Sequence, residues 1–101
     1  MPAGYLIVDI QISDMEQFKQ YMALAPAAVA AAGGEYLARG GKLEALEGDW
    51  HPSRMTLLKF PSFDQAKAFY DSELYAQARA KREGTTDFFN MVLVEGVAAP
   101  I

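Results

Sequence analysis

The chain has 101 residues, which suffices for one domain but not for two. Its net charge of -4 argues against non-specific nucleic-acid binding, which needs a basic face, and no apolar run approaches the roughly 20 residues of a membrane span. The absence of cysteine excludes disulfides, thiolate catalysis and cysteine metal sites, and it fits the cytoplasmic location that we expect. We therefore expect one globular domain over residues 1–101, without nucleic-acid or membrane partners.

The first predicted strand covers Tyr5 to Ile12, where β-branched residues recur with a period of two. The start of the chain lacks the basic segment and the cleavage site of a signal peptide, so we expect its apolar residues to belong to this strand. One face is aliphatic and should pack against helices; it comprises Leu6, Val8, Ile10 and Ile12. The other face comprises Tyr5, Ile7, Asp9 and Gln11.

The first predicted helix begins at Ser13, because Glu16 three residues later completes a capping box. Apolar residues at helical spacing predict its buried stripe, which comprises Phe18, Tyr21, Met22, Ala25, Val29 and Ala32. Pro26 should kink or split this helix, because proline cannot donate a backbone hydrogen bond. Gly33 and Gly34 predict its end, since glycine tolerates the left-handed conformation that follows many helices.

Two further strands are predicted, from Glu35 to Glu47 and from Arg54 to Phe60. The glycines at positions 40 and 41 interrupt the first of them and indicate a bulge or a bend. Between the two strands, the segment EGDWHPS is rich in turn residues.

Two helical pieces and a last strand complete the pattern. Ser62 with Gln65 repeats the capping-box spacing, and Ser72 should cap a second piece that ends at Gly84. The residues expected on the inner faces are Ala66, Phe69, Tyr70, Leu74, Tyr75 and Ala78. The last strand runs from Asp87 to Glu95, and the tail GVAAPI could cross to a partner subunit. The basic residues Arg79, Lys81 and Arg82 are expected to form a solvated helix face, or alternatively an anion gate.

This order of elements predicts an α+β, ferredoxin-like fold, β-α-β-β-α-β, with a four-stranded antiparallel sheet and both helices on one face. The other face would stay open, and a chain of this size cannot leave so much apolar sheet in water. A two-fold homodimer, sheet against sheet, is the simplest solution, and it would bury about 800 Å² on each subunit.

Several short motifs occur together at characteristic spacings. They are ARGG (38–41), LEG (46–48), Trp50-x-Pro52, Arg54, FPS (60–62), AFYDS (68–72), Tyr75, Arg82 and LVEG (93–96). Over nearly the whole chain this combination resembles the domain-of-unknown-function family 1330, a branch of the dimeric α/β-barrel superfamily. The resemblance implies ferredoxin-like dimers whose two sheets form a barrel, and it assigns no catalytic residue. The wider superfamily includes cofactor-free monooxygenases, isomerases, haem-handling enzymes and modules without known chemistry.

The resemblance also implies a ligand pocket between the open sheet face and the helices. We expect its lining to include Arg39, Trp50, His51, Arg54, Tyr70 and Tyr75, with Tyr21 as a further aromatic candidate. Arg39 can pair with two oxygens of a carboxylate or phosphate; the alternative is an ion pair with Asp9 or Glu47. Arg54 could do the same, or it could be a solvated or interface residue at the start of its strand.

Two residues are candidates for acid–base catalysis. His51 is the only histidine and would suit proton abstraction near neutral pH, although it lies in a turn where polar residues are expected in any case. Asp9 faces the open side of the sheet, where partial desolvation would suit an acid–base group. The alternative for Asp9 is a salt bridge within the dimer interface, to Arg39 or Arg54.

Two functions remain open. No phosphate loop, metal-ligand spacing or nucleophile elbow occurs, so we expect no cofactor and no metal. The chain is either a small-molecule-binding protein or cofactor-independent enzyme with a small anionic or aromatic ligand, or a non-catalytic dimeric structural or regulatory module. The first function needs a cavity of a few hundred Å³ with convergent polar groups. The second would fill that space with side chains such as Phe88, Phe89 and Met91.

Overall fold

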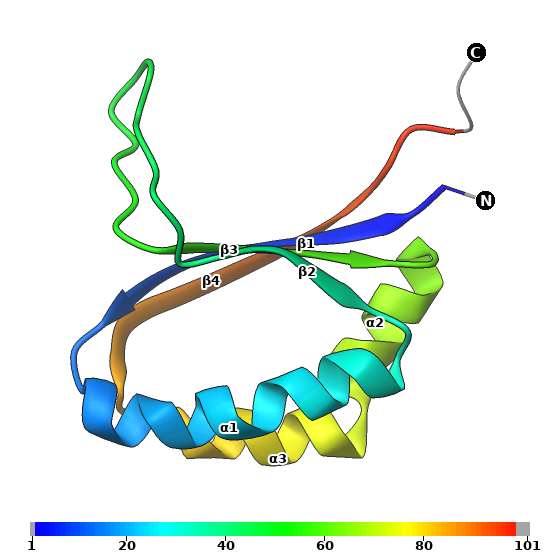
Figure 1. Cartoon of the computed structure of the whole chain (residues 1–101), viewed down its shortest axis with the longest axis horizontal. Coiled ribbons are helices and arrows are strands. Elements are labelled where there is room, and N and C mark those ends of the chain that lie inside the picture. Colours follow the sequence, from blue (N-terminus) through cyan, green and yellow to red (C-terminus); the bar gives the residue numbers. More distant parts are fainter. Residues whose placement is uncertain (1, 99–101) are drawn as a thin grey trace.

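The structure, a computed structural model, describes residues 2–98. Its elements are β1 (Gly4–Ile12), α1 (Met15–Ala31), β2 (Glu35–Arg39), β3 (Met55–Phe60), α2 (Phe63–Asp71), α3 (Glu73–Lys81) and β4 (Thr86–Glu95). The strands form one antiparallel sheet in the order β2-β3-β1-β4, and the helices lie together on one side of it (Figure 1). The predicted ferredoxin-like α+β fold is confirmed.

The alternation of β1 divides the sheet into two chemically different faces. Leu6, Val8 and Ile10 are buried beneath the helices, as predicted. The intervening residues, among them Ile7 and Asp9, are only half-buried and face the side without helices. Pairing with β3 and β4 extends both faces across the sheet, because directly paired residues lie on the same face.

The first helix begins one residue later than predicted. The side chain of Asp14, rather than that of Ser13, caps α1 by accepting a hydrogen bond from the backbone N–H of Gln17 at 3.1 Å. The backbone N–H groups of Ser13 and Asp14 both donate to the carbonyl of Thr85, which holds this segment outside the helix. The helix then continues through Pro26, so the expected split is wrong: buried alanines on either side of the proline stabilise the turn.

The second strand is much shorter than predicted. It ends at Arg39 instead of Glu47, because Gly40 has a φ of 67°, a left-handed conformation that breaks the extended strand. Residues 40–54 leave the sheet as an irregular excursion, which rises from the face opposite the helices (Figure 1). The chain re-enters the sheet at Met55, whose carbonyl accepts from the N–H of Gly40.

The two predicted serine caps are confirmed. The hydroxyl of Ser62 accepts from the N–H of Gln65 at 3.0 Å, and that of Ser72 accepts from the N–H of Tyr75 at 3.2 Å. Tyr75 is fully buried, but Leu74 is 48% exposed, contrary to prediction. The buried face of α3 is formed by Tyr75 and Ala78, and Leu74 in the first turn lies outside that face. Most of the tail is exposed or lies outside the described residues, so its predicted crossing to a partner stays a prediction.

None of the helices within residues 2–98 combines the length and the hydropathy that a bilayer crossing requires.

Candidate ligand-binding site

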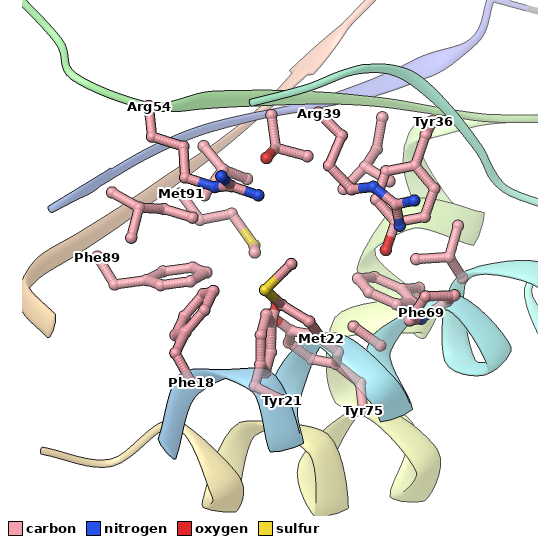
Figure 2. A pocket seen from close by; sticks show the side chains of 17 residues that line it. Phe18, Tyr21, Met22, Tyr36, Arg39, Arg54, Phe69, Tyr75, Phe89 and Met91 are labelled. Carbon is pink, nitrogen blue, oxygen red and sulfur yellow. The ribbon is translucent and has the colours of Figure 1, made fainter. Parts of the chain in front are cut away.

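A cavity of about 210 Å³ lies between the helix-covered face of the sheet and α1 (Figure 2). Its walls are largely apolar and include Val8, Phe18, Met22, Phe69, Phe89 and Met91. The polar side chains on its lining are Tyr21, Tyr36, Arg39, Arg54, Thr56 and Tyr75. Arg39 at the end of β2 and Arg54 just before β3 reach the cavity from the side of the sheet, and Tyr21 and Tyr75 reach it from the helices. The cations therefore lie on the sheet side, together with the hydroxyls of Tyr36 and Thr56, and the hydroxyls of Tyr21 and Tyr75 lie on the helix side.

A β-bulge in β2 places Tyr36 and Arg39 on the same face. With a strict period of two, residues three apart would face opposite sides of the sheet. Here Tyr36 pairs with Leu58 and Arg39 pairs with Thr56, while residues 37 and 38 together oppose Leu57. Both side chains therefore face the helices, and the Arg39 guanidinium lies 4.3 Å from the centre of the Tyr36 ring, in cation–π geometry.

The position of Arg54 depends on Gly40. The Arg54 side chain crosses Gly40 so closely that a Cβ there would lie 2.7 Å from one guanidinium nitrogen. Gly40 thus has two roles: it adopts the left-handed conformation that ends β2, and it leaves room for Arg54 to reach the cavity.

Neither cavity arginine is neutralised within residues 2–98. The ion pairs found there are Lys19–Glu16 and Lys67–Asp71, so no carboxylate lies within 4.0 Å of Arg39 or Arg54. The alternative ion pairs, of Arg39 with Asp9 or Glu47 and of Arg54 with Asp9, do not form among residues 2–98 of one chain. Asp9 lies on the other face of the sheet, so the sheet itself separates it from both guanidinium groups.

A pair of tyrosine hydroxyls lies opposite the arginines. Tyr21 of α1 and Tyr75 of α3 approach each other to 2.8 Å between their hydroxyl oxygens. Burial raises the pKa of Tyr21 far above its usual range, and the neighbouring Tyr75 is the next largest cause of this increase. Burial also raises the pKa of Tyr36, although the Arg39 guanidinium opposes this effect. Tyr21 and Tyr36 therefore remain protonated near neutral pH and can donate hydrogen bonds.

The sequence falls within a recognised family. Residues 3–97 match the family described as "Domain of unknown function (DUF1330)". The chain belongs to the DUF1330 family. This confirms the resemblance that the motifs indicated. No curated protein matches the sequence of this DUF1330 chain.

Solved structures of similar shape support the fold of this DUF1330 chain. A protein of unknown function from Rhodopseudomonas palustris has a TM-score of 0.76 and 13% identity, covering 96% of this chain and 84% of that chain. A dimeric ferredoxin-like protein of unknown function from Thermobifida fusca YX has a TM-score of 0.65 and 17% identity, covering 93% and 91%. A candidate antibiotic biosynthesis monooxygenase from Caulobacter crescentus CB15 has a TM-score of 0.66 and 14% identity, covering 96% and 92%. At these identities the similarity shows the fold alone.

The structure brings together only part of the predicted site. Arg39, Arg54 and Tyr75 line the cavity, whereas Trp50, His51 and Tyr70 do not. The reason for Trp50 and His51 is that the excursion carrying them rises from the opposite face of the sheet. The cavity itself adjoins the helix-covered face and not the open face as predicted, because the open face and the helices lie on opposite sides of the sheet.

The candidate catalytic residues lie outside this cavity. His51 is exposed in the excursion. Asp9 accepts a hydrogen bond at 3.0 Å from the indole nitrogen of Trp50, and its other carboxylate oxygen is buried without a partner in residues 2–98. The structure therefore associates Asp9 and Trp50 with the open face, away from the arginines and tyrosines.

Of the three basic residues expected on a solvated face, Lys81 is exposed, whereas Arg79 and Arg82 are half-buried and packed on aromatic rings. Arg82 lies 3.6 Å from the centre of the Phe89 ring, and Arg79 lies 4.6 Å from that of Tyr70. Arg82 and Tyr70 line a second, more open hollow of about 310 Å³ beside β4. Within residues 2–98, no group of three or more histidine or carboxylate side chains could hold a metal ion.

Sequence reasoning missed Tyr36 and Thr56 as lining residues. Thr56 could have been found from the period of β3, because it alternates with the buried Leu58. Tyr36 carried no such signal, since its orientation relative to Arg39 depends on the bulge.

Proposed function

We propose that this DUF1330 chain binds a small organic molecule in the cavity between the sheet and α1, as a binding protein or as a cofactor-independent enzyme. The observation that carries the proposal is a largely apolar cavity of about 210 Å³ onto which two unpaired guanidinium groups and three tyrosines open. A cavity of about 150 Å³ with apolar walls is large enough to bind benzene. A small anionic or aromatic molecule therefore has room.

The cavity favours this function over a purely structural module. A structural module was expected to fill the space with side chains such as Phe88, Phe89 and Met91. Phe89 and Met91 line the cavity and leave its volume open, while Phe88 lies on the other face of the sheet, paired with Gln11. None of the described lining residues carries a carboxylate or an imidazole, so the hydroxyl and guanidinium groups are the hydrogen-bond donors available to a ligand.

We further propose that the chain forms a homodimer through the open sheet face. Large apolar side chains are exposed there, among them Phe88, Val92 and Val94, with Val92 60% exposed. The excursion adds Leu46 and Trp50 on the same side (Figure 1). Exposure of such an apolar patch to water is energetically unfavourable. A second copy of the chain would cover it, so no other protein is needed. The similar protein from Thermobifida fusca YX is described as dimeric.

The binding function is tested by blocking the cavity. Wild-type protein is titrated with a panel of monocyclic aromatic compounds, anionic and neutral, while NMR shifts of the cavity residues are followed. Ala25→Leu places a larger side chain in the cavity and should weaken binding by at least about tenfold, equivalent to about 1.4 kcal/mol. Ala23→Leu, on the exposed side of the same helix, is the matched control and should bind as wild type. Absence of binding by every compound, or equal binding by Ala25→Leu, would contradict the proposal.

A further inference from the structure

We propose that the ligand of the central cavity is a monocyclic aromatic carboxylate. Its carboxylate contacts Arg39 and Arg54, and its far end accepts a hydrogen bond from the Tyr21–Tyr75 pair. This inference rests on the proposed binding function and specifies the chemistry of the ligand. Three independent features of the cavity carry it: its charge, its size and its unsatisfied hydroxyl donor.

The first feature is the unbalanced positive charge. Arg39, at the end of β2, and Arg54, just before β3, both extend into the cavity, and neither has a carboxylate partner in residues 2–98 (Figure 2). Guanidinium remains protonated at all relevant pH values, so the two cations face an apolar space together. An oxyanion between them would offset both charges and would accept charge-assisted hydrogen bonds. Arg39 is exposed and Arg54 half-buried, so the anion would lie toward the solvent-facing side of the cavity.

The second feature is the size and shape of the apolar space. The volume of about 210 Å³ exceeds the ~150 Å³ that accommodates benzene, which leaves room for one ring with small substituents. Phe18, Phe89 and the sulfur-bearing Met22 and Met91 surround this space. Aromatic edges and thioether sulfurs both make favourable contacts with a flat ring. The anion is assigned as a carboxylate because a ring plus a carboxylate matches this volume and the fork of the arginines.

The third feature is a tyrosine hydroxyl proton that has no acceptor among the described residues. Tyr21 and Tyr75 carry two hydroxyl protons, and the hydrogen bond between them uses one. No other hydrogen bond of these hydroxyls occurs within residues 2–98, and Tyr75 is fully buried. Either hydroxyl can be the donor of this bond, so the second proton, on the accepting hydroxyl of the part-buried pair, is free to bind a ligand oxygen at this end. The ligand therefore has polar groups at both ends of an apolar ring.

The proposal is tested first on the wild-type protein with three probes of nearly equal shape. They are 4-hydroxybenzoate, its neutral analogue 4-hydroxybenzyl alcohol, and benzoate, which lacks the far oxygen. We expect 4-hydroxybenzoate to bind at least about tenfold more tightly than the neutral analogue, because a charged partner strengthens the hydrogen bonds of the arginines. We expect benzoate to bind a few-fold more weakly than 4-hydroxybenzoate, because it leaves the tyrosine proton unpaired.

These outcomes separate the ligand class from the binding function. Equal affinity for the charged and neutral probes would overturn the carboxylate assignment and leave the binding function intact. Equal affinity for benzoate and 4-hydroxybenzoate would overturn the contact with the tyrosine pair. Failure of every compound, including the wider aromatic panel, would overturn both proposals together.

Matched variants locate the contacts. Arg39→Gln and Arg54→Gln should each weaken 4-hydroxybenzoate binding by about tenfold and leave 4-hydroxybenzyl alcohol unaffected. Arg79→Gln removes the same charge outside the cavity and should have no effect. Wild-type affinity in both cavity variants would contradict the arginine assignment.

The tyrosine contact has its own pair of variants. The double variant Tyr21→Phe/Tyr75→Phe removes both hydroxyl protons, so it should reduce 4-hydroxybenzoate affinity to that of benzoate and leave benzoate binding unchanged, which isolates the hydroxyl contact. Tyr70→Phe is the control, because Tyr70 does not line the cavity. An equal loss for both ligands would indicate a general change in packing and would contradict the contact. A melting temperature measured for each variant confirms that it is folded.

Discussion

At the scale of single residues, Gly40 and the bulge residues determine what the cavity contains. Gly40 ends β2, and because it has no side chain it leaves room for the Arg54 guanidinium to reach the cavity. The bulge at positions 37 and 38 places the Arg39 side chain on the face of the sheet that the helices cover. Without the bulge, Arg39 and Tyr36 would face opposite sides of the sheet, and the cavity would lose one of its two cations. The charge of the site therefore depends on irregularities of the backbone and not on the arginines alone.

Gly40→Ala should destabilise the fold more than Gly41→Ala. The φ of 67° at Gly40 is strained for alanine, and its Cβ would also meet the Arg54 guanidinium, so we expect a loss of about 1–3 kcal/mol. Gly41 has an ordinary φ and nothing within 4 Å of an added Cβ, so its replacement should stay within about 0.5 kcal/mol. Urea unfolding of the two variants measures both values; similar losses would show that Gly40 has no special role.

At the scale of elements, helix ends follow from local hydrogen bonding, but the choice of the residue that caps α1 depends on Thr85, a loop residue far away in the sequence. Ser62 and Ser72 cap α2 and α3 within their own turns, as the sequence predicted. Ser13 fits the same pattern but is displaced, because the carbonyl of Thr85 binds the N–H groups of both Ser13 and Asp14. Asp14, the next residue whose side chain can accept a hydrogen bond, therefore caps α1.

Asp14→Ala and Ser13→Ala distinguish the two possible caps of α1. Removal of the Asp14 carboxylate leaves the Gln17 N–H without its acceptor and should cost about 1 kcal/mol of stability. Ser13 makes no side-chain cap, so Ser13→Ala should change the free energy of unfolding by less than about 0.5 kcal/mol. Chemical denaturation followed by circular dichroism gives both values. A larger loss of stability for Ser13→Ala than for Asp14→Ala would show that Ser13 is the capping residue.

At the scale of the whole molecule, the sheet separates two surfaces with different tasks. The helix-covered side contains the core and the cavity, while the open side carries exposed apolar residues and the excursion with Trp50. Asp9 and Trp50 bond to each other on this open side. Their hydrogen bond holds the excursion against β1, on the face of the sheet that we propose as the subunit interface and away from the cavity.

Val92→Lys should dissociate the proposed dimer. Val92 is exposed on the open face, and a charge buried there at a sheet-to-sheet interface would be strongly unfavourable. Ala30→Lys introduces the same charge on the exposed side of α1 and should leave the dimer intact. Sedimentation equilibrium at micromolar concentration measures both. A wild-type protein that sediments as a monomer under these conditions would overturn the proposed interface.

The sequence by itself determined the features that depend on neighbours along the chain. The period of two in β1, the serine caps at positions 62 and 72, and the order of the elements all arise from local geometry, and together they were enough to predict the fold. The sequence also predicts Arg39, Arg54 and Tyr75 as lining residues, since their chemistry is visible in it, and all three line the cavity. Only the tertiary structure decided which face each of them meets. A shift of one residue in strand pairing moves every side chain of that strand to the opposite face of the sheet. The pairing is set by contacts between segments that are far apart in the chain.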